Sequence, residues 1–277
     1  MVRLAVLALF LGAAIQDAAP VEGFPSGAPG LQEEGAKAGP TEGVIPLFNG
    51  KDLAGLTTWL RDTKREDPRK VFTVHDGMIH CSGDGMGYVA TEKAYRDYRV
   101  VVEYKWGTRT DGGKYVRNSG VLLHAGPDGV AGKGAWAHSL EVQLAQGCVG
   151  DLIAIGTKEY PVTLTVETVL GPDKRPRWKK GGTPTVYSGK QFWWSNHDPD
   201  FKELLDTRGK NDVESPMGEW TRIECVCEGK RVTVSVNGVV VNEATDVAPS
   251  AGRILLQCEG FEVFFRKFEL HPLEKKP

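Results

Sequence analysis

The sequence predicts an all-β protein, a β-sandwich or jelly roll. About ten short apolar runs follow one another with turn signals between them, and no convincing amphipathic helix interrupts them. Several runs alternate apolar with polar residues, which is the period of a strand with one buried face. The chain has 277 residues, 40% of them hydrophobic, so it can hold one large β domain or two small ones.

The first residues have the composition of an export signal. Arg3 precedes an apolar run from Leu4 to Ile15, and small residues follow that run. We therefore expect a signal peptide over residues 1–19 and a secreted or periplasmic bacterial protein. The apolar run is too short to span a bilayer, so we expect no membrane contact in the mature form. A buried N-terminal helix is the alternative, and it fits less well because a Pro- and Gly-rich segment follows at once.

The chain changes character twice after this signal. Residues 20–43 are rich in Gly, Pro, Ala and Glu without periodicity, and we expect a disordered linker there. Residues 44–274 are strand-like and are expected to form one β-sandwich domain. Within that domain, residues 156–219 break the strand pattern, and we expect a long loop insertion. The aromatic residues of this insertion, such as Trp194, either stack on sugar faces or anchor the loop on the core.

The strands of the domain are predicted from local patterns. Asp76-Gly77 lies between two apolar runs and suits a two-residue hairpin turn. The segment Tyr98–Trp106 has the β-branching of a core strand. Residues 220–242 predict three strands with turns at Gly229 and at Asn237-Gly238, and residues 253–270 predict two more.

Charge and cysteine content exclude some classes of function. The formal net charge of -2 argues against nucleic acid as a main partner, because phosphate binding requires a basic excess. The five cysteines form no CxxC pair and no Cys/His spacing typical of zinc sites. We expect them to be small buried hydrophobic residues. Nothing in the sequence indicates an oligomeric state.

Two neighbouring runs carry polar residues at strand spacing. Glu141 and Gln143 share one face of the run 139–144, and Asn118 and His124 share one face of the run 118–124. If the runs pair, a carboxylate, amides and an imidazole converge on one side of a sheet. The alternative is the solvated outer face of an antiparallel sheet, and from these two runs alone it is the simpler interpretation.

No nucleotide-binding glycine pattern, P-loop, HExxH or GxSxG motif occurs at a credible place. Six segments instead occur in a fixed order: LFNGKDL at 47–53, NSG at 118–120, SLEVQL at 139–144 with Gly150-Asp151 after it, GEW at 218–220, NG at 237–238, and LQCEG with FR at 256–266. Together they make the chain resemble the 3-keto-disaccharide hydrolase domain family from Leu47 to Leu273. Thr221 and Lys267 depart from the family pattern.

The resemblance implies a concanavalin A-like jelly roll of two antiparallel sheets that acts on sugars oxidised at C3. A 3-keto group acidifies the proton on C2, so that a modest base can remove it and the C1 substituent can leave. Addition of water to the product then gives net hydrolysis. Such a site requires a general base and an electropositive group near the ketone oxygen. The resemblance implies that a divalent metal ion could supply the second role.

Carried over to this sequence, the resemblance makes Glu141 the first candidate, as general base or metal ligand. His124 is a candidate for the same two roles, and Asp151 is either a third metal ligand or a turn cap. Candidate contacts to the oxidised sugar are Gln143, Asn118, Gln257, Glu259, Arg266 and Trp194. Most of these have a plain structural alternative, such as a cross-strand hydrogen bond for the glutamines or an Arg266–Glu259 ion pair.

Two other functions fit the same fold. One is a carbohydrate-binding module without catalysis, in which aromatic residues stack on sugars. The other is a conventional glycoside hydrolase, which needs two carboxylates flanking one bond. Glu141 with either Asp151 or Glu259 is the candidate pair for that chemistry.

Overall fold

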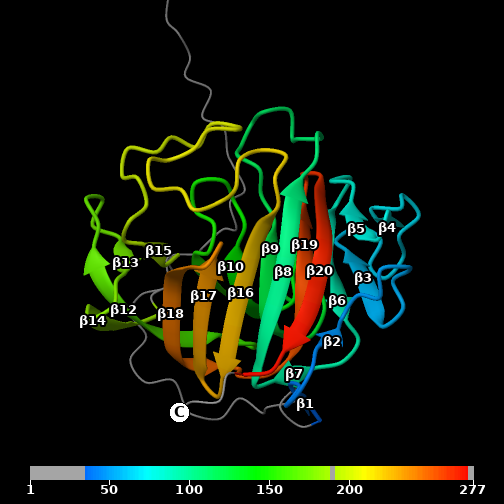
Figure 1. The fold of residues 1–277 in the computed structure, drawn as a ribbon, viewed down its shortest axis with the longest axis horizontal. Helices are drawn as coiled ribbons and strands as arrows, with labels where there is room; N and C mark the ends of the chain where they lie inside the picture. Colours follow the sequence, from blue (N-terminus) through cyan, green and yellow to red (C-terminus); the bar gives the residue numbers. More distant parts are fainter. Residues whose placement is uncertain (1–34, 188–190, 274–277) are drawn as a thin grey trace, which may run out of the picture.

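The computed structural model describes residues 35–187 and 191–273 and shows two β-sheets packed face to face (Figure 1). The smaller sheet has the order β11 (Leu152–Ile155), β10 (Ser139–Gln143), β9 (Gly120–Ala125), β19 (Arg253–Glu259), β6 (Met86–Thr91) and β3 (Leu56–Leu60). The larger sheet has the order β15 (Trp193–Trp194), β13 (Pro176–Trp178), β12 (Thr163–Leu170), β18 (Val239–Ala248), β17 (Arg231–Val236), β16 (Thr221–Glu228), β8 (Tyr98–Trp106), β20 (Val263–His271), β5 (Met78–Cys81) and β4 (Phe72–His75).

Short strands complete the architecture. Outside the main order, β14 (Thr183–Val186) pairs with β12, and β2 (Ile45–Pro46) pairs with β20. The pairings are antiparallel except for β13 with β15, and for β1 (Lys37–Ala38) with β7 (Tyr95–Arg96). One 3₁₀ turn, η1, covers Gly132–Gly134. The all-β class and the jelly-roll sandwich expected from the sequence are confirmed.

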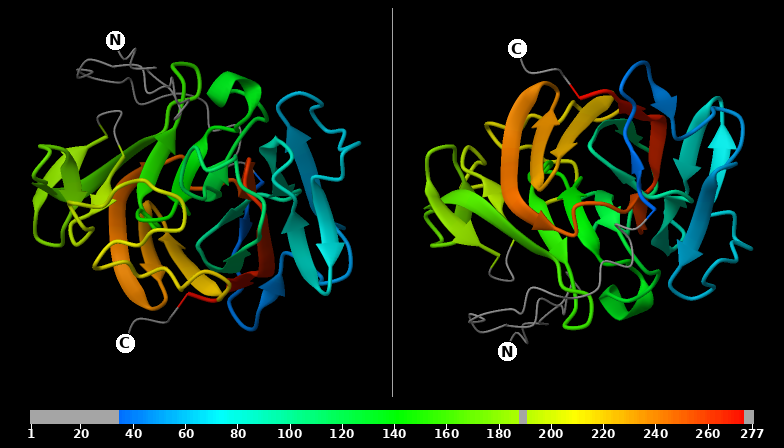
Figure 2. Two further views of the ribbon diagram at one scale, coloured as in Figure 1. Left: turned by 90° about the horizontal axis from the view of Figure 1, so that it is seen from above. Right: turned by 90° about the horizontal axis from the view of Figure 1, so that it is seen from below.

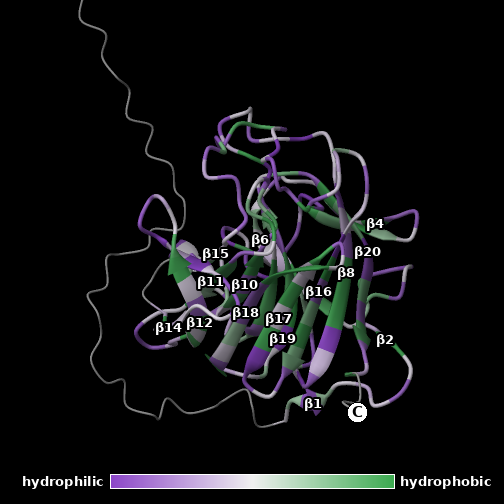
Figure 3. Cartoon of the chain, turned by 60° about the vertical axis from the view of Figure 1, so that its left-hand side comes forward, coloured by the Kyte–Doolittle hydropathy of each residue, from purple (hydrophilic) through white to green (hydrophobic). Residues whose placement is uncertain are grey.

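Alternating side chains build the core between the two sheets. In β16, Ile223, Cys225 and Cys227 are buried in the core, whereas the residues between them are partly exposed. Figure 3 shows the result as alternating hydrophobic and hydrophilic bands along the strands. The five cysteines, all in the described part of the chain, are buried and unpaired, so they act as the small core residues that we expected.

The predicted turns and strands occur at their expected positions. Asp76 and Gly77, with φ of 49° and 74°, form the turn between β4 and β5. Asn237 and Gly238, with φ of 49° and 82°, do the same between β17 and β18. Positive φ at both central residues matches the right-handed twist of a hairpin, which explains why an Asn or Asp precedes Gly at these places.

The segment 156–219 is only partly the loop that we predicted. It contains β12 to β15, and β12 extends the larger sheet by pairing with β18. The alternation in residues 163–168 was the missed signal, because Leu164 and Val166 are buried and their neighbours are not. The strands β12 to β14 extend from one side of the sandwich, opposite the side that carries β3 to β6 (Figure 2).

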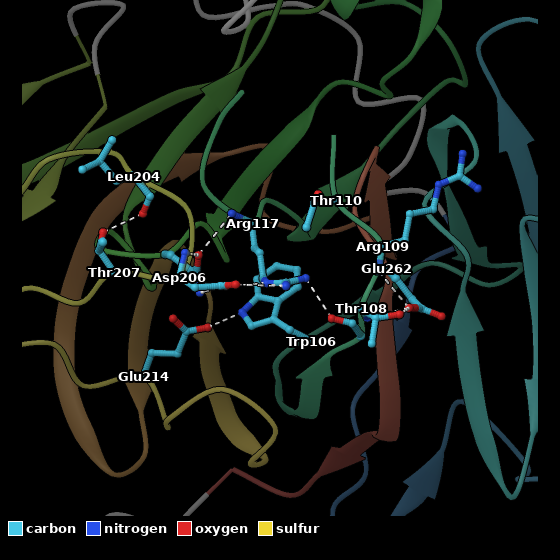
Figure 4. A network of polar contacts seen from close by, with 12 residues as sticks. Trp106, Thr108, Arg109, Thr110, Arg117, Leu204, Asp206, Thr207, Glu214 and Glu262 are labelled. Carbon is cyan, nitrogen blue, oxygen red and sulfur yellow. Dashed lines mark hydrogen bonds and ion pairs between the residues drawn. The ribbon is translucent and has the colours of Figure 1, made fainter. Parts of the chain in front are cut away.

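Polar contacts fix the rest of this insertion, residues 195–219, over one end of the sheets (Figure 4). Arg117 Nε donates to Asp206 Oδ1 at 2.7 Å. Glu214 is buried and accepts hydrogen bonds from the Tyr104 hydroxyl at 2.7 Å and from Trp106 Nε1 at 2.6 Å. Burial raises the pKa of Glu214 to about 7. A buried carboxyl with two donors holds the loop in one position.

The N-terminal expectations are tested only in part. The signal peptide predicted over residues 1–19 lies outside the described residues, as does most of the expected linker, 20–43. The end of that linker is not disordered, because β1 pairs with β7 there. Among the described residues no helix has the length and apolar character required to cross a membrane.

The close packing of β6 against β3 predicts that a side chain at position 87 would destabilise the fold. A Cβ added at Gly87 would lie 1.9 Å from the Trp59 carbonyl oxygen and 2.9 Å from the Leu60 Cα. Gly87→Ala is therefore expected to lower the free energy of unfolding by about 3 kcal/mol or more, because backbone atoms must move. Urea unfolding measures this change.

Gly181→Ala is the control for that substitution. Position 181 also favours glycine, because its φ is 79°, but a Cβ there would meet no atom within 4 Å. Its expected cost is about 1 kcal/mol, from backbone conformation alone. Equal losses in the two variants would contradict the close β3–β6 contact.

Candidate active site

The polar residues predicted for the site gather on the outer face of the smaller sheet. In the β9–β10 pair, Glu141 lies opposite Leu122 and Gln143 lies opposite Gly120, so the two runs form neighbouring strands. The residues between them along β10, Leu140 and Val142, pack in the core between the sheets. Glu141 and Gln143 therefore point away from the core, although both are buried.

Strand β19 brings two more polar residues to this face. It pairs with β9 on the side opposite β10. Leu256 and Cys258 of β19 point into the core, which leaves Gln257 and Glu259 on the outer face. The Asn118 Nδ2 donates a hydrogen bond to Glu259 Oε2 at 2.8 Å. Four of the predicted residues, Glu141, Gln257, Glu259 and Asn118, thus come together from β10, β19 and the segment just before β9.

Gly120 forms the bare floor beneath this group. A Cβ at Gly120 would lie 2.6 Å from Glu141 Oε1 and 3.1 Å from Gln257 Oε1. Both oxygen atoms therefore project over the backbone of β9 at the one position without a side chain. Any larger residue there would occupy the space that these oxygen atoms share.

The two carboxyl groups have unusual electrostatics. Burial, and then the nearby Glu259 carboxyl, raise the pKa of Glu141 well above its ordinary range, and a hydrogen bond from Gln257 opposes the shift. Burial raises the pKa of Glu259 to about 7. Glu141 is buried and Glu259 is half-buried, and two carboxyl groups that interact in this way titrate as a pair and retain one proton near neutral pH. One member can then accept a proton while the other donates one.

The site also contains acceptor oxygen atoms without donors. Glu141 Oε1, Gln257 Oε1 and Asn118 Oδ1 are buried, and no described residue donates a hydrogen bond to them. Buried polar atoms are normally satisfied, so a cluster of three unmatched acceptors needs an explanation. A ligand with several hydroxyl donors, such as a sugar, matches this cluster.

His124 does not join Glu141. We predicted that the two side chains share a face, but His124 has φ of 55° and lies where the β9–β19 register shifts. Its Nδ1 lies 3.0 Å from the Pro249 carbonyl oxygen, and its ring packs edge-on against Tyr98 in the core. The bulge turns the side chain away from the outer face, so the predicted role of His124 as base or ligand beside Glu141 is wrong.

Asp151 anchors the insertion. Its buried carboxylate accepts hydrogen bonds from Gln191 Nε2 at 2.8 Å and from the Trp194 backbone N–H at 3.2 Å. His197 Nε2 lies 2.7 Å from the same carboxylate, and the charge of Asp151 raises the pKa of His197 against the effect of burial. The Asp151 carboxylate therefore contacts three residues of the insertion, whereas the Glu141 carboxyl interacts with Gln257 and Glu259 of β19.

The metal ligands that the resemblance implied are thus not assembled. His124 contacts Pro249, Asp151 contacts the insertion, and neither lies with Glu141 in one group. Across residues 35–187 and 191–273, no cluster of three or more His, Cys, Asp or Glu is placed to hold a metal ion. The residues present do not fit that site.

Two predicted sugar contacts also lie elsewhere. Arg266 occupies a bulge in β20, where its Nε donates to Glu103 Oε2 at 2.6 Å and its guanidinium stacks on Trp220 at 4.4 Å. It lies on the outer face of the larger sheet, and its partner is Glu103 rather than Glu259. Trp194 is buried in the core between the sheets, so it anchors the insertion and presents no face to a sugar.

The structure adds residues that sequence patterns did not indicate. Tyr88 lies opposite Gln257 in the β6–β19 pair, and its hydroxyl donates to Asp128 Oδ1 at 2.8 Å. The loop 126–138 packs through Trp136 on the outer face of the smaller sheet, against Tyr88 and Leu122. No spacing in the sequence connects Asp128 with a tyrosine forty positions away.

The raised pKa of Glu259 predicts a pH-dependent stability. In the folded protein the protonated form is favoured up to about pH 7, against 4.5 for the free group, so its stabilising effect is complete below pH 4.5 and is lost as pH rises through 7. Glu259→Gln does not titrate. The free energy of unfolding of the variant minus that of the original protein is therefore expected to increase by about 1–3 kcal/mol between pH 4.5 and pH 8.

Urea unfolding at the two pH values measures this gain. Glu219→Gln, at an exposed glutamate, is the matched control and should show no such pH dependence. A Glu259→Gln variant whose free energy of unfolding differs from that of the original protein by the same amount at both pH values would contradict a raised pKa of Glu259.

Several solved structures are similar to the chain at low identity. Two crystal structures of candidate glycosyl hydrolases from Parabacteroides distasonis are each 18% identical; they cover 84% of this chain and 94% and 100% of their own, with TM-scores of 0.47 and 0.46. A carbohydrate-binding module, CBM66 from Bacillus subtilis, is 11% identical, covering 78% of this chain and 96% of that module, with a TM-score of 0.39. Similarity at these levels does not bear on activity. No curated protein matches the chain. Residues 43–271 match one family over most of the chain, and the protein belongs to the 3-keto-alpha-glucoside-1,2-lyase-like domain family.

Proposed function

We propose that the protein cleaves 3-keto-glycosides at the outer face of the smaller sheet. The observation that carries the proposal is the pair of carboxyl groups with raised pKa, Glu141 and Glu259, set among unmatched hydrogen-bond acceptors. Elimination next to a ketone needs one base and one acid, and this pair can supply both near neutral pH. Membership of the family supports the class of substrate.

In the proposed reaction, the Glu141 carboxylate removes the proton from C2 of the 3-keto sugar. The C2–H electron pair forms an enolate, and the enolate then expels the C1 oxygen together with the C1–O bonding pair. The Glu259 carboxylic acid gives its proton to that oxygen. The products are a 1,2-unsaturated 3-keto sugar and a free alcohol, and addition of water across the new double bond gives net hydrolysis.

The ionised Glu259 raises the pKa of Glu141, so in the free protein the shared proton is favoured on Glu141, and the proposed reaction requires it on Glu259 once the substrate is bound. The hydrogen bonds suggest how each carboxyl could then act. Asn118 donates to Glu259 Oε2, so a proton on Glu259 is placed on Oε1. Glu141 Oε1 has no donor among the described residues and lies over Gly120, where a substrate atom has room. The amide oxygen of Gln143 accepts the Leu144 backbone N–H at 3.0 Å, which leaves its NH₂ group to donate to the substrate ketone.

The same pair of carboxyl groups favours a second candidate function, conventional glycoside hydrolysis. That reaction also uses two carboxyl groups at one bond, and the sequence alone had not placed Glu141 beside Glu259. It differs in its substrate, because it requires no oxidation at C3. Sugar binding without cleavage needs the acceptor cluster but neither acid.

The first test replaces the base. Glu141→Gln keeps the size of the side chain but cannot accept the C2 proton, so kcat on 4-nitrophenyl 3-keto-glucoside is expected to fall about 100-fold or more. The released nitrophenol is followed by absorbance, and Glu219→Gln is the control for loss of one exposed acid. Cleavage of only the unoxidised glucoside would overturn the elimination, and binding without turnover would indicate a binding module.

The second test separates acid from base. Glu259→Gln removes the proton donor to the leaving oxygen, which a poor leaving group needs and nitrophenol hardly needs. We expect kcat on methyl 3-keto-glucoside to fall at least about tenfold more than kcat on the 4-nitrophenyl compound. Glu141→Gln should reduce both alike, because both substrates lose the same C2 proton. If Glu259→Gln lowers kcat on the methyl and the 4-nitrophenyl substrates by the same factor, Glu259 is not the acid.

A further inference from the structure

The outer face continues past Glu259 to the edge of the smaller sheet. Glu259 lies opposite Met86 in the β19–β6 pair, and the Arg61 backbone N–H donates to the Met86 carbonyl oxygen at 2.8 Å. Leu60 is in the core and Trp59 is on the outer face, so Arg61 is on the outer face by alternation. Arg61 therefore lies two strands from Glu259 in one row, roughly 10 Å away at the usual strand spacing.

A hollow opens at this end of the row. Its volume is about 270 Å³, which suits a single ring better than an extended chain. The residues that line it are Arg61, Asp62, Arg69, Asp84, Gly85 and Met86. Met86 is shared between the hollow and the row that contains Glu259, so the two are adjacent.

The charges around the hollow leave one guanidinium unmatched. Asp62 is paired with Arg69 at 2.7 Å, and Asp84 is paired with Arg109 at 2.8 Å. Among the described residues, the Arg61 side chain has no ion-pair or hydrogen-bond partner, and it is exposed. Each acid of the hollow is therefore paired with another arginine, since Arg109 reaches Asp84 from outside the hollow, and the Arg61 guanidinium is available to a ligand. An arginine fork matches a carboxylate with two parallel hydrogen bonds.

We propose that this hollow holds the leaving group, and that Arg61 selects leaving groups that carry a carboxylate, such as a uronate sugar. The inference rests on the proposed function, because Glu259 is the acid that protonates the leaving oxygen. The leaving group must then lie on the Glu259 side of the bond, and the row of residues leads from Glu259 to Arg61.

Two matched substrates test the selection. They are a 3-keto-glucosyl-glucose and the corresponding 3-keto-glucosyl-glucuronate, which differ only in a hydroxymethyl or carboxylate group on the leaving sugar. The protein is expected to prefer the uronate in kcat/KM. Arg61→Ala should lower that preference about two- to fivefold, as for an exposed ion pair. The measured quantity is the ratio of the two kcat/KM values, in which any loss common to both substrates cancels.

Two further variants make the result specific. Arg61→Lys keeps the charge and should retain part of the preference, whereas Lys70→Ala removes one charge from the same β3–β4 loop outside the hollow and should change nothing. Rising salt should weaken the preference of the original protein but not that of Arg61→Ala.

The outcomes distinguish the two proposals. If both substrates are cleaved and Arg61→Ala leaves their ratio unchanged, the leaving-group site is wrong and the proposed function stands. The same holds if Lys70→Ala lowers the ratio as much as Arg61→Ala does. If neither substrate is cleaved, the proposed function fails, and the leaving-group site fails with it.

Discussion

The pairing of β9 with β10 on one side and with β19 on the other determines where every polar group of the site lies. Because the side-chain period of a strand is two, this register places Glu141, Gln257 and Glu259 on the outer face and their neighbours in the core. A shift of one residue in either pairing would exchange the acids with core residues. The apolar inner face, which cannot be exposed, therefore holds the acids in position.

The same arrangement carries an energetic cost. Glu141 is buried and Glu259 is half-buried, and both carboxyl groups have a raised pKa, so keeping either one ionised opposes folding. The cost is tolerated because strands β9, β10 and β19 also contribute fully buried residues such as Leu123, Leu140 and Leu256 to the core. A fold in which both carboxyl groups were exposed to water would be more stable, but neither acid would then keep a proton near neutral pH.

The features that depend on neighbouring residues could be predicted from the sequence, and those that depend on distant strands could not. The turns at Asp76-Gly77 and Asn237-Gly238 are local, and so is the shared face of Glu141 and Gln143. His124 and Arg266 were misplaced because each lies where a register shift breaks the alternation, and that shift comes from pairing with a strand far along the chain. Asp151 was misjudged since its partners follow it by about forty residues.

Asp151 also joins the insertion to the site itself. Its carboxylate binds Gln191 and His197, while its backbone carbonyl accepts the N–H of Gln143 at 2.9 Å. One residue thus connects the insertion to the strand that carries Glu141. A displacement of residues 191–197 would therefore be transmitted through Asp151 to the backbone of Gln143, next to Glu141 on the same strand face.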